Sequence, residues 1–581
     1  MSAQDFGILA LEVYFPRYYI SQPDLEVADG CPGKYVKGLE QESLGFCTIE
    51  EDISSICLTA VSNLVRRLNL DLLNVGFMEV GTETLIDKSK STKTVLMQLF
   101  EACGNFDVEG IDVKNACFGG TAALFHALNW LESSAWDGRL ALVVAGDIAV
   151  YGSKAARPTG GAGAVAILLG PNAPLVIDPG LRSHHVQHKY DFYKPDMSSE
   201  YPTVDGPLSL QCYRDALIQC YRKYKRRVWT KNQLPVVVSA PLQKPGLSSL
   251  HNIDYLCFHS PFTRLVRKAY GWLVMDDMLA LHPDKEATTN GSVIDDSIAE
   301  NGTNNLAATI DDQVRTAFTS IVNGVGADPA KQSTRDVDIL CMEATRSLFS
   351  VKVEHSLVFA KHVGNMYTAS LYGCLASLLF SVPELELRNR RILMYSYGSG
   401  LAAAMFSLTV HPSRPLVNVI GSTASPDRKQ NPVFNRLFNQ RTRLQVSEFE
   451  KLLNERRSSH NAAPFKPSHN PDGLFPGSYF LTEVDESHRR TYEVLPSQAP
   501  ELPKESILML LHGDPKCPVS LSTDMHNSRT CRMLSDKNMS NAAGMFPRKV
   551  RLLAHFKRVA VIQNLTAIVF RATYEQKASV I

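Results

Sequence analysis

The longest run of small and apolar residues with helical spacing begins beside a cysteine and covers residues 117–131. Cys117 is followed by Gly-Gly-Thr at 119–121, and apolar residues continue to Leu131 without a proline. Almost no polar face remains, so the pattern predicts a buried helix that starts at the cysteine. Asp-Gly then ends this helix ahead of an apolar strand at 140–144.

Strand-like and helix-like patterns alternate around this helix throughout residues 1–171. Residues 7–15 and 75–84 have the pattern of buried strands, and 49–68 has the pattern of an amphipathic helix. Alternation of this kind is typical of an α/β fold in which helices cover the sheets. We therefore expect a layered α/β protein.

A similar unit recurs in the second half of the chain. A small-residue apolar helix is predicted at 369–380, and strands are predicted at 391–400 and 401–410. The first half has the same order of helix, strand and strand. The repeat predicts two pseudo-symmetric halves, in which two helix N-termini face one site.

Composition and charge exclude several classes of function. The net charge is +1, so no overall field favours nucleic acid or an anionic membrane. Twelve cysteines occur singly without a CxxC pair, which indicates a reducing compartment rather than a disulfide framework. The charge-free run at 392–410 contains Tyr-Ser-Tyr-Gly-Ser-Gly, so we expect buried sheet there and no membrane span.

Two further sequence features bear on compartment and metal binding. The N-terminus lacks the patterns of signal and transit peptides, which predicts a cytoplasmic protein. His184 and His188 would share the face of a helix, with His185 beside them. Because no cysteine or carboxylate completes a ligand set, we expect no metal site.

Cys117 is the first candidate for catalysis. Unpaired N–H groups and the positive end of a helix dipole stabilise a thiolate, so its pKa is expected to lie below the usual value. The alternative is a structural cysteine, since free cysteine is among the most buried residue types. The other candidate residues decide between these interpretations.

Glu83 and His259 complete a possible catalytic set. Glu83 comes at the end of a predicted strand, and His259 follows another short strand and precedes a helix with basic residues. Each also has a structural interpretation, as a surface glutamate or a packed histidine. Together with Cys117 they supply a base, a group that polarises a carbonyl, and a nucleophile.

Several long segments, in fixed order, resemble hydroxymethylglutaryl-CoA synthase. They are EVGTETLIDKSKS, NACFGGTAALF, LVVAGDIAVY, YDFYKPDMSSEYPTVDG, FHSPF, GNMYTASLYG and SYGSGLAA. The resemblance covers about residues 6–495. It implies the thiolase-like layered αβαβα fold, with an N-terminal half at 1–171 and a C-terminal half at 172–495. An insertion is expected near 283–342, and residues 496–581 form a basic extension that we expect to be poorly ordered.

The resemblance also implies a reaction. Cys117 would be acetylated by acetyl-CoA, and Glu83 would remove a proton from the acetyl methyl group. The enolate would attack acetoacetyl-CoA, whose carbonyl His259 would polarise, and water would release (3S)-hydroxymethylglutaryl-CoA. The resemblance implies no cofactor and no metal. It does imply a homodimer and a place in mevalonate, isoprenoid and sterol synthesis.

Positions for CoA and acyl groups follow from the same resemblance, namely Lys34, Thr159, Ser209, Arg264, Lys268, Asn365 and Ser399. Three positions depart from the family pattern. Arg264 stands in place of lysine, Ala155 in place of asparagine, and Phe118 in place of tyrosine. Each lost hydrogen bond is expected to cost about 0.5–1.5 kcal/mol of binding without abolishing turnover.

Two alternatives stay open at the level of sequence. One is a different thiolase-like condensing enzyme; those enzymes lack a glutamate in the ETLIDKS context. The other is a catalytically impaired acyl-CoA-binding homologue, disabled by the insertion or the C-terminal extension.

Overall fold

A computed structural model describes residues 5–152, 154–233, 249–281, 335–421, 431–468 and 470–496, together with 316, 318 and 321. These residues belong to one compact unit, Met1–Asp514. Within them, no helix is both long and apolar enough to cross a bilayer. The expected extension from 497 onward and most of the expected insertion near 283–342 lie outside the described residues. Residues 335–342 of that insertion belong to helix α9 (Arg335–Ala344).

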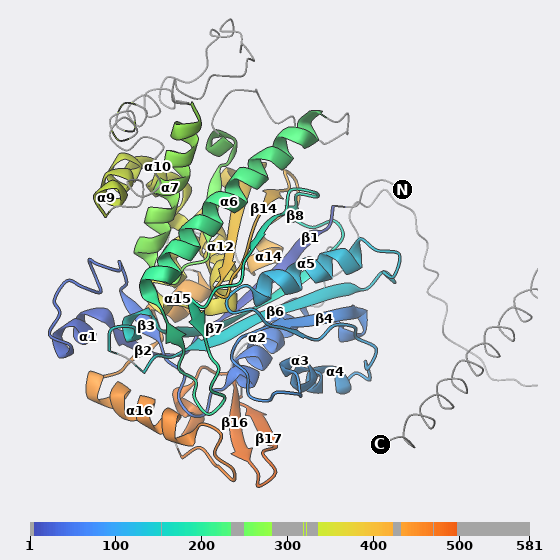
Figure 1. Cartoon of the computed structure of the whole chain (residues 1–581). Helices are drawn as coiled ribbons and strands as arrows, with labels where there is room; N and C mark the ends of the chain where they lie inside the picture. Colours follow the sequence, from blue (N-terminus) through green and yellow to red (C-terminus); the bar gives the residue numbers. More distant parts are fainter. Residues whose placement is uncertain are drawn as a thin grey trace, which may run out of the picture. The chain divides into compact units, whose positions relative to one another are not determined.

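A ten-stranded mixed sheet joins the two halves of the chain (Figure 1). The first half supplies β1 (Gly7–Tyr14), β4 (Val75–Gly81), β5 (Asp112–Val113), β6 (Leu140–Ala149) and β7 (Gly161–Gly170). The second half supplies β8 (Leu175–Ile177), β9 (Ser183–Val186), β12 (Tyr255–Phe258), β13 (Arg391–Gly398) and β14 (Ala402–Val410). The order is β12-β13-β14-β8-β1-β7-β6-β4-β5, with β9 paired to β14. Strand β8 pairs with β1 and with β14 and so links the halves.

Helices lie on both sides of each half of the sheet. Helix α2 (Ile53–Leu68) packs on β1, β6 and β7, and α5 (Gly119–Leu131) packs on β4 and β6. In the second half, α12 (Ser370–Ser381) packs on β12 and β13, and α6 (Gly206–Gln233) packs on β9 and β14. Figure 1 shows α2 and α5 on opposite sides of β6. This arrangement is the layered α/β fold expected from the sequence.

The predicted repeat is confirmed by these elements. Helix α5 leads into the antiparallel pair β6 and β7, and α12 leads into the antiparallel pair β13 and β14. Most residues of both helices are buried, as their small-residue patterns predict. A Cβ atom on Gly81 would lie 2.3 Å from the backbone nitrogen of Gly120. The end of β4 therefore touches the start of α5, which brings the residues after each element together.

The remaining elements surround this core. Strands β2 (Tyr18–Ser21), β3 (Ser43–Gly45) and β15 (Thr442–Arg443) form one small sheet, and β10 (Phe192–Tyr193) pairs with β11 (Thr203–Val204). Strands β16 (Tyr479–Val484) and β17 (Arg490–Val494) form a hairpin. The helices are α1 (Gln22–Ala28), α3 (Thr92–Leu96), α4 (Gln98–Glu101), α7 (Thr263–Leu281), α10 (Arg346–Lys352), α11 (Val358–Val363), α13 (Glu384–Leu387), α14 (Val417–Ile420), α15 (Pro432–Asn439) and α16 (Val446–Ser459).

The prediction that His184 and His188 share the face of a helix is wrong. Residues Ser183–Val186 form strand β9, which pairs with β14. The His184 ring packs edge-on against Phe125 of α5, with ring centroids 5.5 Å apart. Pairing at the side of β14 and contact with the core decide the local structure here, and neither is visible in a short sequence window.

Candidate active site

Cys117 lies two residues before the first residue of α5 and faces Glu83. Its thiol donates a hydrogen bond to Glu83 Oε1 at 3.4 Å. The preceding residue, Ala116, has a φ of 42°, a left-handed conformation that costs an L-residue about 1–2 kcal/mol. The surrounding structure holds this turn and thereby directs the thiol toward the end of β4.

Glu83 is buried at the end of β4, with 8% of its surface exposed. Its backbone N–H donates to Asp147 Oδ1 at 2.8 Å. Burial raises the pKa of the Glu83 carboxyl, and the charge of Lys194 opposes this shift. The carboxyl thus occupies a site where its protonation depends on its neighbours.

The expectation of a low pKa for Cys117 is not met in this structure. Burial and the neighbouring Glu83 carboxylate raise the pKa of the thiol well above its usual value. Helix α5 begins at Gly119, beyond the cysteine, so the helix terminus does not outweigh these effects. The thiol therefore carries its proton as a hydrogen-bond donor to Glu83.

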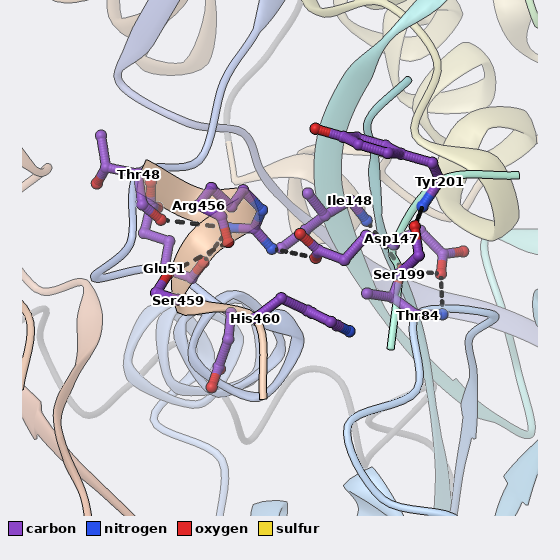
Figure 2. Close-up of polar contacts among 12 residues, drawn as sticks. Thr48, Glu51, Thr84, Asp147, Ile148, Ser199, Tyr201, Arg456, Ser459 and His460 are labelled. Atoms are coloured by element: carbon purple, nitrogen blue, oxygen red, sulfur yellow. Dashed lines mark hydrogen bonds and ion pairs between the residues drawn. The ribbon is translucent and has the colours of Figure 1, made fainter. Parts of the chain in front are cut away.

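Asp147 is a buried carboxylate that joins the two halves and that sequence analysis missed. Its Oδ1 accepts a hydrogen bond from Thr82 Oγ1 at 2.9 Å. The same oxygen accepts from the Thr84 N–H and hydroxyl at 2.9 and 2.8 Å (Figure 2). Its Oδ2 accepts from the Thr368 N–H at 3.0 Å and hydroxyl at 2.6 Å. An acidic residue within the apolar strand β6 is the signal that could have identified it.

Lys194 is the second residue that sequence analysis missed. Its Nζ lies 3.1 Å from Glu83 Oε2, on the side of the carboxylate away from Cys117. The ammonium also lies 4.6 Å from the centre of the Tyr367 ring. Lys194 lies in the segment YDFYKPDMSSEYPTVDG, which carries part of the family resemblance, but no spacing rule connects this lysine with Glu83.

His259 follows strand β12 and is buried in the neutral state. Its backbone N–H donates to the Tyr395 carbonyl at 2.8 Å, and its own carbonyl accepts from the Tyr213 hydroxyl at 2.8 Å. Burial lowers the pKa of the His259 imidazole to about 3. Its Nδ1 is buried and has no hydrogen-bond partner among the described residues.

The sheet places His259 at the same edge as Cys117. Strand β12 runs parallel to β13, and a Cβ atom on Gly398, the last residue of β13, would lie 2.5 Å from the Phe118 nitrogen. The segment after Cys117 therefore rests on the end of β13. Within the described residues, no hydrogen bond joins the His259 side chain to Cys117 or Glu83.

A cavity of about 340 Å³ lies beside Glu83 and Lys194. Its far end is lined by a polar cluster in which Arg456 is central. Arg456 donates to the Glu51 carbonyl at 2.9 Å and the Thr48 carbonyl at 3.3 Å, and it pairs with Glu200 at 2.7 Å. Figure 2 shows Arg456 beside Glu51 and Thr48, with Asp147 and Thr84 on the other side.

Three of the expected CoA-binding residues lie around the segment 29–41. The Glu26 carboxylate accepts backbone N–H bonds from Gly33, Tyr35 and Val36, which holds exposed Lys34 at the surface. Arg157 pairs with Asp29 at 2.5 Å and thereby fixes the turn of Thr159 against this segment. The Arg264 backbone N–H donates to the Leu39 carbonyl at 3.0 Å. Lys34, Thr159 and Arg264 thus belong to one surface region.

The other expected binding residues have varied surroundings. Lys268 pairs with Asp338 of α9 at 3.0 Å, so its charge is already engaged. Buried Asn365 accepts from the Tyr367 N–H at 2.9 Å. The Ser399 carbonyl accepts a hydrogen bond at 3.4 Å from Asn115, which lies two residues before Cys117. Ser209 lies in the first turn of α6. Of the departures from the family pattern, Ala155 is exposed and Phe118 is buried.

The described residues contain no cluster of three or more His, Cys, Asp or Glu side chains that is suited to a metal ion. The catalytic candidates Glu83, Cys117 and His259 are side chains that can act as acids, bases or nucleophiles.

Comparisons with known proteins cover almost all of the described chain. Residues 2–174 match the family model for the N-terminal domain of hydroxymethylglutaryl-coenzyme A synthase, and residues 175–326 and 301–495 match that for its C-terminal domain. The mitochondrial hydroxymethylglutaryl-CoA synthase of Rattus norvegicus is 45% identical over 494 residues, 84% of this chain and 89% of that protein. The cytoplasmic synthase of Gallus gallus is 45% identical over 499 residues, 84% of this chain and 87% of that protein.

Solved structures show the same relationship. The structure of MvaS in complex with 3-hydroxy-3-methylglutaryl coenzyme A is 28% identical, with a TM-score of 0.64 over 85% of this chain and 100% of that chain. The sequence matches span both halves of the fold and all the catalytic candidates. This chain therefore belongs to the hydroxymethylglutaryl-CoA synthase family, whose members are condensing acyltransferases with the thiolase-like fold.

Proposed function

We propose that this chain condenses acetyl-CoA with acetoacetyl-CoA and water to give (3S)-hydroxymethylglutaryl-CoA and CoA. The observation that carries the proposal is the partly buried contact between the Cys117 thiol and the Glu83 carboxylate at 3.4 Å. A nucleophile and a base that touch each other suit a reaction that joins two acyl groups. Membership of the family supports the same reaction.

The first step is transfer of the acetyl group to Cys117. The sulfur attacks the thioester carbonyl of acetyl-CoA, the bond from the carbonyl carbon to the CoA sulfur breaks, and the thiol proton passes to the departing CoA thiolate. One thioester replaces another, so the free energy changes little. Because burial keeps the proton on Cys117 in the free protein, removal of this proton accompanies the attack rather than preceding it.

The second step is carbon–carbon bond formation. Glu83 removes a proton from the acetyl methyl group, and the resulting enolate carbon attacks the ketone carbon of acetoacetyl-CoA. Glu83 then returns the proton to the new alkoxide, so the carboxylate is regenerated. Neutral His259 donates a hydrogen bond to the ketone oxygen and stabilises the negative charge that develops there.

Hydrolysis completes the cycle. Water attacks the thioester at Cys117, the carbon–sulfur bond breaks, and the product leaves with a new carboxylate while the thiol and one proton are released. We also propose that the reaction needs no prosthetic group or metal, since each step uses side chains and CoA thioesters. On this account the product enters isoprenoid and sterol synthesis through mevalonate, in the cytoplasm.

A homodimer is part of the same proposal. Strand β5 is the outermost strand at one end of the sheet, and exposed strand edges tend to pair. Phe106 and Ile111 beside it are 73% and 53% exposed, which is unusual for large apolar residues next to a sheet edge. A second copy of the chain would cover this edge by a twofold, self-complementary contact.

The direct test is a single-turnover experiment. Purified protein is exposed briefly to acetyl-CoA, and acetoacetyl-CoA is then added. Mass spectrometry is expected to show an acetyl group on the Cys117 peptide that disappears as hydroxymethylglutaryl-CoA forms. A folded protein without acetylation would support the impaired acyl-CoA-binding homologue instead.

A further inference from the structure

Lys194 lies against Glu83 although the two residues come from different halves of the chain. The ammonium is 3.1 Å from Glu83 Oε2, while Glu83 Oε1 is 3.4 Å from the Cys117 sulfur. The two oxygens of one carboxylate thus have different partners. The side chains of Lys194 and Glu83 are 17% and 6% exposed, so water screens this ion pair only weakly.

The loop that carries Lys194 is fixed at both ends. Asp191 accepts hydrogen bonds from the Tyr397 hydroxyl at 2.8 Å and the Gly400 N–H at 2.8 Å, which ties the loop to the end of β13. Strand β10 then pairs with β11 immediately before Lys194. These contacts hold the backbone on both sides of the loop, so Lys194 reaches Glu83 from an anchored position.

Aromatic rings hold the ammonium from a second side. Lys194 Nζ lies 4.6 Å from the centre of the Tyr367 ring and 5.6 Å from that of Phe192. The two rings pack edge-on with centroids 5.8 Å apart. A cation over aromatic faces is stabilised in its charged form, and the arrangement restricts the lysine to the direction of Glu83.

The other charges around Glu83 do not favour its ionised form. Burial and the carboxylate of Asp147 both raise the pKa of Glu83, and Lys194 is the cation that opposes them. A general base acts only when it is ionised, so the lysine has a chemical consequence. The titratable groups around this pair are Asp147 of β6, Cys117 before α5, Tyr151 after β6, Tyr367 before α12, and Glu200 on the Lys194 side.

We propose that Lys194 is a positioning residue for condensation: it keeps Glu83 ionised and directs Oε1 of that carboxylate toward the acetyl group on Cys117. The inference rests on the proposed function, because it assigns to Lys194 a role in the step that Glu83 performs. Lys194 takes no part in the proton transfer. The proton that moves passes from the methyl carbon to Glu83 Oε1 and then to the alkoxide, while Oε2 stays paired with the ammonium.

The test compares Lys194→Gln with Lys194→Arg, starting from preformed acetyl-enzyme. Single-turnover condensation with acetoacetyl-CoA is measured from pH 5.5 to about 9. For Lys194→Gln we expect acetylation of Cys117 at the wild-type stoichiometry. The acidic limb of the condensation profile is expected to move to higher pH by about one unit, with about tenfold slower condensation below it. Lys194→Arg keeps the charge and is expected to restore most of the wild-type profile.

Lys189→Gln is the matched control, because it removes the same charge from an exposed position outside the Glu83 contact. It is expected to leave the profile unchanged. A Lys194→Gln profile with an unshifted acidic limb would overturn the inference, and so would a rate loss that Lys194→Arg does not rescue, since both indicate a purely structural lysine. These results are distinct from failure of the proposed function, in which the wild-type protein itself does not become acetylated.

Discussion

Cys117 and Glu83 share a hydrogen bond in a site that disfavours charge on either of them. Burial raises the pKa of both groups. The Glu83 carboxylate raises the pKa of the thiol further, whereas the hydrogen bond from the thiol lowers the pKa of Glu83. The proton on the sulfur therefore leaves only when a thioester arrives. A thiol with a raised pKa has a low thiolate content, which lowers its reactivity toward oxidants.

His259 provides a prediction at the scale of a single residue. His259→Ala removes a neutral hydrogen-bond donor whose ring is buried and whose Nδ1 has no partner among the described residues. We expect kcat/KM for acetoacetyl-CoA to fall about 100-fold, because one donor to a developing oxyanion contributes this much. Acetylation of Cys117 is expected to continue. Steady-state kinetics with varied acetoacetyl-CoA measure the effect.

His411→Ala serves as the control for this substitution, since His411 lies after β14 and bonds only to nearby Ser413 among the described side chains. Its kinetics are expected to match those of the wild type. If kcat/KM for acetoacetyl-CoA is the same in His259→Ala as in the wild type, His259 has no role in binding or activating acetoacetyl-CoA.

At the scale of elements, Asp147 connects strand β4 with the segment before α12. Its two oxygens bind Thr82, Glu83 and Thr84 on one side and Thr368 on the other. Asp147→Asn replaces an acceptor oxygen by an amide group that faces donors. We expect a loss of about 2–4 kcal/mol in the free energy of unfolding, because buried hydrogen bonds to a charged group are lost. Denaturant titration measures it.

Asp137→Asn is the matched control, because the side chain of exposed Asp137 bonds, within the described part of the chain, only to Arg139. Its effect is expected to stay within about 0.5 kcal/mol. Equal stability of Asp147→Asn and the wild type would show that Asp147 does not join the halves energetically.

The polar cluster near α16 gives a pH-dependent prediction. Glu51 is 1% exposed, and burial raises its pKa from 4.5 to about 7. The folded state therefore binds a proton more tightly than the unfolded state. The stabilisation from this group is complete below pH 4.5 and is lost as the pH rises through about 7. The full effect is about 3 kcal/mol, at about 1.4 kcal/mol per unit.

Glu51→Gln tests this assignment because glutamine does not titrate. The difference in unfolding free energy between the variant and the wild type is expected to change by about 3 kcal/mol in favour of the variant between pH 4.5 and pH 8. His259 contributes with the opposite sign, since its stabilisation is lost as the pH falls below 6.5, but it is common to both proteins and cancels. A pH-independent difference would contradict the assignment.

The elements of the core were accessible to sequence analysis, whereas the partners of the site residues were not. Continuous apolar runs identified α5, α12 and the strands that follow them, because most residues of these elements are buried. The resemblance to the family placed Glu83, Cys117 and His259. Lys194 and Asp147 were missed because their roles depend on tertiary contacts between residues far apart in the chain. The expectation of a low pKa for the Cys117 thiol was wrong for the same reason. An argument from local helix geometry leaves out the effects of burial and of the Glu83 carboxylate.

At the scale of the whole molecule, the proposed dimer predicts a defined interface. Phe106→Asp combined with Ile111→Lys places charges beside the outer strand β5, where both apolar side chains are exposed. We expect the variant to sediment as a monomer, because a charge buried in an interface costs several kcal/mol. Leu385→Lys, which alters another exposed apolar side chain on α13, is the control and is expected to leave the dimer intact. A dimer that persists in the double variant would exclude this edge.

The account depends most directly on a covalent intermediate at Cys117. The measurement is intact-mass and peptide analysis of the wild type, Cys117→Ala and Glu83→Ala after brief exposure to acetyl-CoA and again after addition of acetoacetyl-CoA. We expect the wild type to gain and then lose one acetyl group. Cys117→Ala is expected to gain none, and Glu83→Ala to gain one and keep it, because it lacks the base for condensation. Acetylation of Cys117→Ala, or loss of the acetyl group with product formation in Glu83→Ala, would contradict the account.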